Sequence, residues 1–168
     1  MSRSVDMRFD IRAAEGDADI ERVRELFREY QAWLGVDLCF QDFDTELAAL
    51  PGVYAPPRGR LYLVFDEAGE ALVGCVALKP LGPDTCEMKR LYVRDAWRGN
   101  GLGRSLAELC VTEGRRIGYR HICLDTLAHL HAARTLYADM GFRETKPYYD
   151  NPLEGVSFMS LNLAAGTG

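Results

Sequence analysis

The stretch Arg98-Gly99-Asn100-Gly101-Leu102-Gly103-Arg104 is the part of the sequence that decides the fold. It joins a strand-like segment, 86–93, to a helix-like segment, 104–117. Its three alternating glycines leave the backbone N–H groups unobstructed, and the helix that follows begins with unpaired N–H groups and a partial positive charge. A glycine-rich turn from a strand into a helix predicts an anion site, best suited to phosphate.

The glycines fit one phosphate-binding pattern and fail two others. A nucleotide P-loop requires the pattern G-x-x-x-x-G-K-[ST], and the chain contains no Gly-Lys pair. The dinucleotide fingerprint G-x-G-x-x-G places Arg104 or Leu106 where its third glycine belongs. The remaining pattern, R/Q-x-x-G-x-G/A, is matched in full by Arg98, Gly101 and Gly103. The turn therefore predicts a phosphate-containing ligand that is bound neither as in a nucleotide P-loop nor as in a dinucleotide fingerprint.

Hydrophobic periodicity around the turn predicts strands and helices in the order β-α-α-β-β-β-α-β-α-β-β. The expected strands are 7–12, 61–65, 71–78, 85–93, 121–125, 142–149 and 156–163. The expected helices are one that follows the turn at 16–19 and ends at Leu34, and three over 44–50, 104–117 and 130–140. No repeat, low-complexity run or linker interrupts them, so we expect one domain over residues 1–168.

Composition narrows the class of protein. The net charge of −5 argues against a nucleic-acid partner or an anionic membrane, because either favours a basic surface. No apolar run reaches the roughly 18 residues of a membrane span, and the N-terminus has no apolar signal region. The five cysteines include no C-x-x-C pair, which favours reduced and buried thiols. We therefore expect a cytoplasmic protein.

A second segment, 132–142, carries Leu136-Tyr137 and Gly141-Phe142 and is similar to the pattern A-x-x-L-Y-x-x-x-G-F. With this segment and the glycine turn, the chain resembles the GNAT superfamily of acyl-CoA-dependent N-acyltransferases over nearly its whole length. The resemblance implies an α/β (α+β) fold, with a mixed, mostly antiparallel sheet of about seven strands and helices on both faces. It also implies acetyl-CoA as co-substrate and N-acetyl transfer as the activity.

In this family the glycine turn holds the pyrophosphate of coenzyme A, and the end of the preceding strand pairs with the pantetheine arm. The resemblance therefore implies cofactor contacts at Leu91, Tyr92, Val93, Arg98, Gly99, Asn100, Gly101, Leu102, Gly103 and Arg104. The physical chemistry agrees, because pantetheine carries amides and an exposed strand edge offers matching donors and acceptors. A backbone N–H near Tyr92 and Val93 is the expected oxyanion donor.

The implied chemistry is attack of an amine on a thioester, for which the amine must lose a proton. An alkylammonium with a pKa of about 10.4 loses its proton at pH 7 at a cost of about 4.6 kcal/mol, so a general base helps. Glu87 has the offset from Arg98 that the catalytic glutamate has in the family's histone-modifying branch. The alternative is a solvated glutamate or a salt bridge to Lys89 or Arg90. Asp125 is a weaker candidate for the base.

Tyr137 matches the family tyrosine that approaches the sulfur of coenzyme A. The departing thiolate has a pKa of about 8.5 and gains from a proton donor, which a phenol can supply. A core tyrosine on an apolar helix face is the alternative. Many relatives carry an asparagine seven residues earlier, where this chain has Leu130 between His129 and His131. That contact is either absent or made by a histidine. The two histidines diverge and have no evident third ligand, so we expect no metal.

The acceptor site is expected opposite the cofactor, between the first two helices, 30–43, and the loop 148–154. Within that loop Asp150 and Glu154 suit an ammonium group. Arg60 and Arg90 suit a carboxylate instead, as in an amino-acid substrate, and the sequence leaves this choice open.

We expect the partner to be a primary amine on a small molecule or peptide. The alternative function is a non-catalytic acyl-CoA-binding module that senses or sequesters the cofactor. Glu87 and Tyr137 favour the enzyme. A homodimer is plausible for the fold, although no interface is evident in the sequence.

Overall fold

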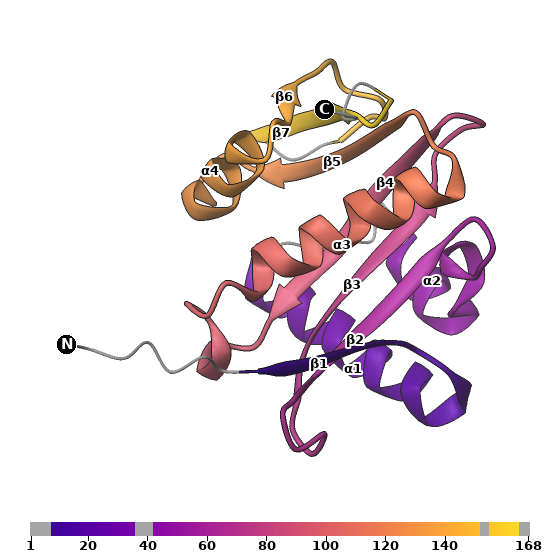
Figure 1. Ribbon diagram of the computed structural model, residues 1–168, viewed down its shortest axis with the longest axis vertical. Coiled ribbons are helices and arrows are strands. Elements are labelled where there is room, and N and C mark those ends of the chain that lie inside the picture. The colour runs from indigo at the N-terminus through magenta and orange to yellow at the C-terminus, as the bar shows by residue number, and fades with distance from the viewer. Residues whose placement is uncertain (1–7, 36–41, 152–154, 165–168) are drawn as a thin grey trace.

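The computed structural model describes residues 8–35, 42–151 and 155–164. Its strands are β1 (Phe9–Ala13), β2 (Arg60–Asp66), β3 (Leu72–Pro80), β4 (Thr85–Val93), β5 (His121–Leu127), β6 (Arg143–Glu144) and β7 (Val156–Asn162). Its helices are α1 (Gly16–Leu34), α2 (Phe43–Ala49), α3 (Leu102–Ile117) and α4 (His131–Asp139), with short 3-10 helices η2 (Gly52–Tyr54) and η3 (Asp95–Trp97). Strands and α-helices follow the order that the sequence predicts (Figure 1).

Seven strands form one sheet in the order β1-β2-β3-β4-β5-β7-β6. Neighbouring strands run antiparallel except β4 and β5, which run parallel. Helices cover both faces of the sheet (Figure 1). The predicted fold class, an α/β protein with a mixed and mostly antiparallel sheet, is confirmed.

Two hydrophobic cores hold the helices to opposite faces of the sheet. On one face α1 buries Val23 and Phe27, which lie at helical spacing, beside Leu47 of α2. On the other face α3 buries Leu106, and α4 buries Tyr137. Full burial of a large apolar side chain stabilises the fold by roughly 1.5–3 kcal/mol. The sheet is therefore a fixed frame between two packed layers.

The parallel strands β4 and β5 separate soon after they begin to pair. Their register covers Thr85 to Glu87 opposite His121 to Cys123, whereas β4 continues to Val93 and β5 to Leu127. Beyond the paired residues each strand turns a backbone edge toward a gap instead of toward the other strand. We call this gap the fork, and the diverging strands are visible in Figure 1.

A β-bulge in β4 sets which side chains face the fork. Between two paired positions β3 advances two residues while β4 advances three, from Lys89 to Tyr92. Arg90 has a φ of 58°, in the left-handed region that residues with a Cβ seldom adopt. Its buried guanidinium donates two hydrogen bonds of 3.1 Å to the carboxylate of Glu46 on α2. This ion pair holds the bulge in place.

Some predicted boundaries differ from those observed. β6 covers Arg143–Glu144 rather than 142–149, because Pro147 has no N–H with which to continue the strand. The second helix ends at Ala49, one residue early, because the residue before Pro51 favours an extended backbone. The predicted start of the first strand lies outside the described residues.

The cysteines within the described residues are buried as the sequence predicts. The four described ones, Cys75, Cys86, Cys110 and Cys123, are free thiols. Burial raises the pKa of Cys86 and of Cys123 to about 12, so both thiols stay protonated at neutral pH. Among the helices in the described ranges, none has both the length and the apolar composition needed to cross a bilayer.

Candidate active site

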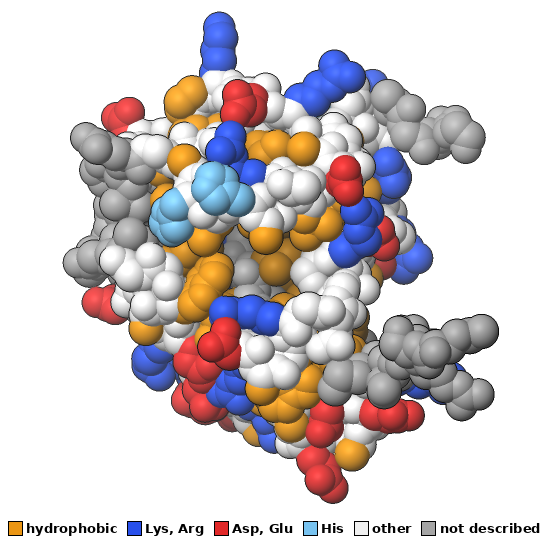
Figure 2. Space-filling model, turned by 90° about the vertical axis from the view of Figure 1, so that its left-hand side faces the viewer, with side chains coloured by type: hydrophobic (Ala, Val, Ile, Leu, Met, Phe, Trp, Pro, Cys, Tyr) orange, Lys and Arg blue, Asp and Glu red, His pale blue; other side chains and the backbone are white. Residues whose placement is uncertain are grey.

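A cleft of about 300 Å³ lies at the fork between β4 and β5. Residues of α1 and α4 line it on either side, and the glycine turn lines it near the start of α3. Figure 2 shows a face of the molecule that is hollowed near its centre, with hydrophobic side chains gathered in the hollow. The cleft thus joins the segments that the sequence assigns to the cofactor with part of the segment assigned to the acceptor.

The glycine turn has the backbone geometry of an anion site. Gly99 and Gly101 have φ angles of 85° and 77°, which favour glycine over residues with a Cβ. Gly101 is the N-cap of α3, so this helix starts at Leu102, two residues earlier than predicted. Its first helical hydrogen bond runs from the N–H of Ser105 to the carbonyl of Gly101 at 3.1 Å. The N–H groups of 102–104 therefore precede the helical ladder and remain donors.

The backbone of β4 offers a second set of donors and acceptors. The N–H of Arg94 donates to the carbonyl of Val73 on β3 at 2.8 Å. Because successive residues of a strand alternate, Val93 turns its N–H and carbonyl the other way, toward the fork. Leu91 and Val93 both line the cleft beside Tyr92. This edge leads directly from the fork to the glycine turn.

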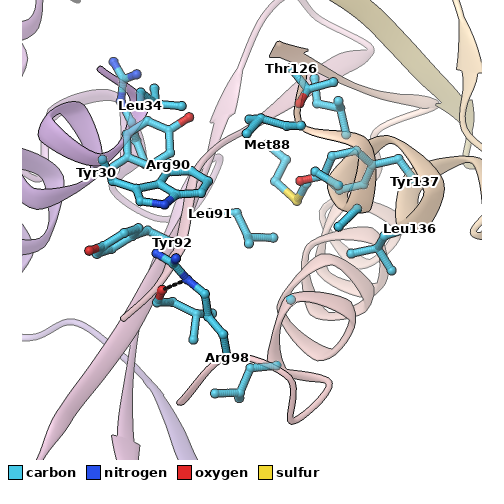
Figure 3. A pocket seen from close by; sticks show the side chains of 18 of the residues that line it. Tyr30, Leu34, Met88, Arg90, Leu91, Tyr92, Arg98, Thr126, Leu136 and Tyr137 are labelled. Atoms are coloured by element: carbon cyan, nitrogen blue, oxygen red, sulfur yellow. Dashed lines mark hydrogen bonds between the residues drawn. The ribbon is translucent and has the colours of Figure 1, made fainter. Parts of the chain in front are cut away.

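Arg98 lies across the end of this edge. Its Nε donates to the carbonyl of Val93 at 2.8 Å (Figure 3). Its guanidinium lies over the rings of Trp33 and Tyr92, 4.8 Å and 5.7 Å from their centroids. A ligand that accepts the full strand edge must therefore displace one hydrogen bond of Arg98.

Two of the predicted cofactor residues turn their side chains away from the cleft. Asn100 is exposed, and its side-chain amide donates to the carbonyl of Trp97 at 2.9 Å. Arg104 lies 3.5 Å from Glu108 and 3.3 Å from Asp139. Their backbone N–H groups still belong to the turn, so we expect backbone contacts from both residues.

Glu87 lies at the base of the fork, where β4 last pairs with β5. Its buried carboxylate accepts a hydrogen bond of 2.7 Å from the hydroxyl of Tyr148. The ammonium groups of Lys79 and Lys89 each lie 3.8 Å from a carboxylate oxygen. Burial and the nearby Glu87 carboxylate raise the pKa of Tyr148, so its phenol stays protonated as the donor. The sequence suggests two salt-bridge partners for Glu87. Lys89 forms this salt bridge, whereas Arg90 pairs with Glu46 of α2 instead.

Asp125 forms a second pair of the same kind beside the first. It lies on β5 two residues beyond Cys123, the last residue of β5 that pairs with β4, and it lines the cleft. The hydroxyl of Tyr149 donates to Asp125, and the side-chain amide of Asn151 donates to the Tyr149 oxygen at 2.9 Å. Adjacent tyrosines thus bond to carboxylates on adjacent strands. Asp125 faces the cleft, whereas Glu87 lies behind its lining.

Tyr137 lines the cleft from α4. Figure 3 shows its hydroxyl directed toward Met88 of β4. Its ring packs against Phe142, with 5.8 Å between the ring centroids. Burial raises the pKa of Tyr137, so its phenol stays protonated and can donate a hydrogen bond at neutral pH. The residue therefore has a core ring and a hydroxyl at the fork.

The position of the family asparagine is occupied by Leu130, which lines the cleft at the N-cap of α4. His129 and His131 are exposed and are not among the lining residues, so neither supplies the missing contact. In the part of the chain that the structure describes, no group of three or more His, Cys, Asp or Glu side chains could hold a metal ion.

The arginines suggested for an acceptor carboxylate are engaged elsewhere. Arg60 does not line the cleft and lies 3.4 Å from Glu113. Arg90 lines it, but its charge is paired with Glu46. The structure therefore brings neither arginine to an acceptor as an unpaired cation.

Of the other residues predicted around the acceptor, some line the cleft and others do not. Tyr30, Trp33 and Leu34 of α1 line the cleft as expected. Asp150 is exposed and does not line it. Glu154 and residues 36–41 of the predicted acceptor segment lie outside the described residues.

The comparison with protein families shows which family the chain belongs to. The model of the Acetyltransferase (GNAT) family matches residues 20–142, from α1 through the glycine turn to the end of the Tyr137 segment. The chain belongs to the GNAT acetyltransferase family. This GNAT acetyltransferase is 43% identical over 155 residues to an uncharacterized N-acetyltransferase of Schizosaccharomyces pombe, which covers 92% of this chain and 94% of the relative. It is 34% identical over 123 residues to the uncharacterized N-acetyltransferase YjgM of Escherichia coli, 71% of each chain.

Solved structures share the fold of this GNAT chain. An acetyltransferase of the GNAT family from Staphylococcus aureus has a TM-score of 0.76 at 21% identity, covering 93% of this chain and 99% of the other. The protein yncA from Salmonella typhimurium, solved with its cofactor acetyl-CoA, has a TM-score of 0.66 at 22% identity, covering 95% and 96%. These likenesses support the sheet and helix arrangement.

Sequence reasoning missed three features of the GNAT site. The bond between Tyr148 and Glu87 joins segments 61 residues apart, and no local pattern pairs them. The sequence suggested a salt bridge between Lys89 and Glu87, but it did not indicate that Lys89 also lines the cleft. The bulge at Arg90 carries no glycine and so had no sequence signal.

Proposed function

We propose that the chain transfers an acetyl group from acetyl-CoA to the primary amine of a small molecule or peptide, by direct attack in a ternary complex. The observation that carries this proposal is the continuous cleft, in which turn amides, a strand edge and the fork beside Asp125 follow one another. Membership of a family that uses acetyl-CoA supports the donor. The two ends of the cleft suit the two substrates.

The pyrophosphate of the cofactor binds the N–H groups at the start of α3, because a helix N-terminus favours an anion. The pantetheine arm then runs along β4 and bonds to the backbone of Leu91 and Val93. Arg98 releases the Val93 carbonyl as the arm enters, and its cation then lies beside the phosphates. The thioester reaches the fork between β4 and β5.

Glu87 is the proton acceptor in this proposal, reached through Tyr148. The hydroxyl of Tyr148 takes a proton from the acceptor ammonium through a bridging water as it gives its own proton to Glu87, 2.7 Å away. Neither Glu87 nor Tyr148 is among the residues that line the cleft, so a water molecule links this relay to the acceptor. Asp125, which does line the cleft, attracts and orients the ammonium.

Tyr137 assists the leaving group. The thiolate of coenzyme A gains negative charge as the carbon–sulfur bond breaks, and the protonated phenol donates a hydrogen bond to it. An ordinary phenol already has a higher pKa than a thiol, about 10 against about 8.5, and burial raises the pKa of Tyr137 further. The phenol therefore stabilises the thiolate with a hydrogen bond and keeps its proton. Solvent completes the protonation as the product leaves.

The experiment that tests the function is release of free thiol from acetyl-CoA across a panel of amines. Turnover with at least one amine, with an acetylated product identified by mass spectrometry, is the expected result. Binding of acetyl-CoA without turnover on any amine contradicts the enzyme and favours the second candidate, a non-catalytic acyl-CoA-binding module. We also propose the cytoplasm as the place of action, on the buried free thiols.

A further inference from the structure

Lysine is rare in this chain, and its placement is informative. The sequence has three lysines and seventeen arginines. The ammonium groups of Lys79 and Lys89 each lie 3.8 Å from an oxygen of Glu87, whereas Lys146 is exposed. Arginine keeps its proton in proteins, but a buried lysine can lose it and become a nucleophile. Beside Glu87 the chain therefore uses the cation that can react with a thioester.

The two lysines at Glu87 differ in their access to the cleft. The side chain of Lys79 is 29% exposed, and Lys79 is not among the cleft residues. The side chain of Lys89 is 8% exposed, and Lys89 lines the cleft. Its Nζ also lies 5.8 Å from the ring centroid of Tyr149. Its access to reactants is therefore through the cleft and not through the outer surface.

The position of Lys89 relative to the fork brings it near the reacting group. It lies two residues beyond Glu87, the last residue of β4 that pairs with β5, so it stands at the mouth of the fork. Leu91 and Val93, whose edge would carry the pantetheine arm, follow on the same strand. Tyr137, which would face the sulfur, lines the same cleft from α4. Burial lowers the pKa of Lys89, which raises the neutral fraction of this amine at a given pH.

We infer that Lys89 is itself an acyl acceptor, and that the chain acetylates this residue when acetyl-CoA is bound and no external amine is in place. This inference rests on the proposed function. The lone pair of the neutral Lys89 nitrogen attacks the thioester carbonyl, a carbon–nitrogen bond forms, and the carbon–sulfur bond breaks with its electron pair on sulfur. The proton released from nitrogen passes to Glu87, and the thiolate takes a proton from solvent. The products are Nε-acetyl-lysine and free coenzyme A.

The modification changes the site in a defined way. An amide carries no charge, so Glu87 loses one of the two ammonium groups that lie 3.8 Å from it. The added acetyl group also occupies part of the cleft beside Asp125. Acetylated chains are therefore expected to turn over an external amine more slowly than unmodified chains. Acetylation of Lys89 thus inhibits the enzyme when acetyl-CoA is abundant and the acceptor amine is absent.

The test incubates the purified full chain with acetyl-CoA without any amine and follows acetylation of the three lysines by peptide mass spectrometry. A parallel arm uses acetyl phosphate, a chemical donor that lacks the pantetheine arm. Lys89 is expected to be acetylated at least tenfold faster than Lys146 by acetyl-CoA, although it is far less exposed. Acetyl phosphate should favour Lys146, and excess coenzyme A should suppress only the reaction at Lys89. The Lys146→Arg variant should leave the rate at Lys89 unchanged.

Two results overturn the inference. One is acetylation by acetyl-CoA that follows exposure, with Lys146 modified at least as fast as Lys89. The other is an unmodified Lys89 in a chain that still releases thiol with an external amine, in which case the proposed function stands without this reaction. A chain that neither modifies Lys89 nor turns over any amine contradicts the proposed function as well.

Discussion

At the scale of single residues, the site depends on two tyrosine–carboxylate pairs that come from one loop and two strands. Tyr148 donates to Glu87, and Tyr149 donates to Asp125. One carboxylate lies behind the cleft lining and the other forms part of it. This division separates proton transfer, which needs a protected base, from attraction of the cationic amine, which needs an accessible charge.

The first prediction separates these two roles. Glu87→Gln is expected to lower kcat by about 100-fold, since the relay through Tyr148 loses its final proton acceptor. Asp125→Asn is expected to raise KM for the amine with a smaller change in kcat. Steady-state thiol release at several amine concentrations measures both, with circular dichroism as the control for folding. A larger loss of kcat in Asp125→Asn than in Glu87→Gln would assign the base to Asp125.

The second prediction concerns Tyr137. Tyr137→Phe removes the donor to the thiolate and should lower kcat by about 10- to 100-fold, the value of a hydrogen bond to a charged group of about 1.5–3 kcal/mol. KM for acetyl-CoA should change little. Because burial raises the pKa of Tyr137, kcat of the unmodified enzyme should not fall through ionisation of this phenol near its ordinary pKa of about 10. Unaltered kcat in the variant contradicts the role.

At the scale of elements, the glycine turn and the bulge of β4 shape the cofactor half of the cleft. The turn presents N–H groups because Gly99 and Gly101 take left-handed backbone angles. The bulge depends on Arg90, which takes such an angle without being glycine and is held by Glu46. The glycines of the local sequence therefore predict the turn, whereas the bulge depends on a contact between β4 and α2.

The third prediction compares two glycines of the turn. Gly101→Ala forces a Cβ into a backbone with a φ of 77°, at roughly 1–2 kcal/mol, and should raise Kd for coenzyme A by about tenfold. Gly103→Ala is the matched control, because its Cβ would only meet Leu136 at an ordinary 3.7 Å. Titration calorimetry with coenzyme A measures both affinities. Equal losses in the two variants contradict the role of the left-handed angle.

The fourth prediction concerns the ion pair beneath the bulge. Glu46→Ala leaves the guanidinium of Arg90 buried without its carboxylate and should destabilise the fold by about 3–5 kcal/mol. Urea denaturation measures the free energy of unfolding. Glu21→Ala is the control, because that carboxylate is exposed and should cost less than about 1 kcal/mol. A loss as small in Glu46→Ala would show that other contacts hold the bulge.

At the scale of the whole molecule, the sequence predicts the order of strands and helices along the chain, but it predicts only part of the strand pairing within the sheet. Periodicity locates most strands and helices, as β4 shows by its exact predicted span, 85–93. Local sequence does not encode where β4 and β5 stop pairing. That point depends on contacts between two strands that α3 separates along the chain. The same limit hid the bond from Tyr148 to Glu87. The one-domain organisation and the homodimer stay predictions.

The most direct measurement of the central claim is an amide NMR titration of the isotope-labelled chain with acetyl-CoA, and with ATP as the control phosphate ligand. If the cofactor lies along β4 and the glycine turn, acetyl-CoA shifts the N–H signals of Leu91, Val93 and 99–104 first and most. ATP at the same concentration leaves the signals of Leu91 and Val93 in place. Equal shifts with ATP, or acetyl-CoA shifts confined to other parts of the chain, would contradict the account.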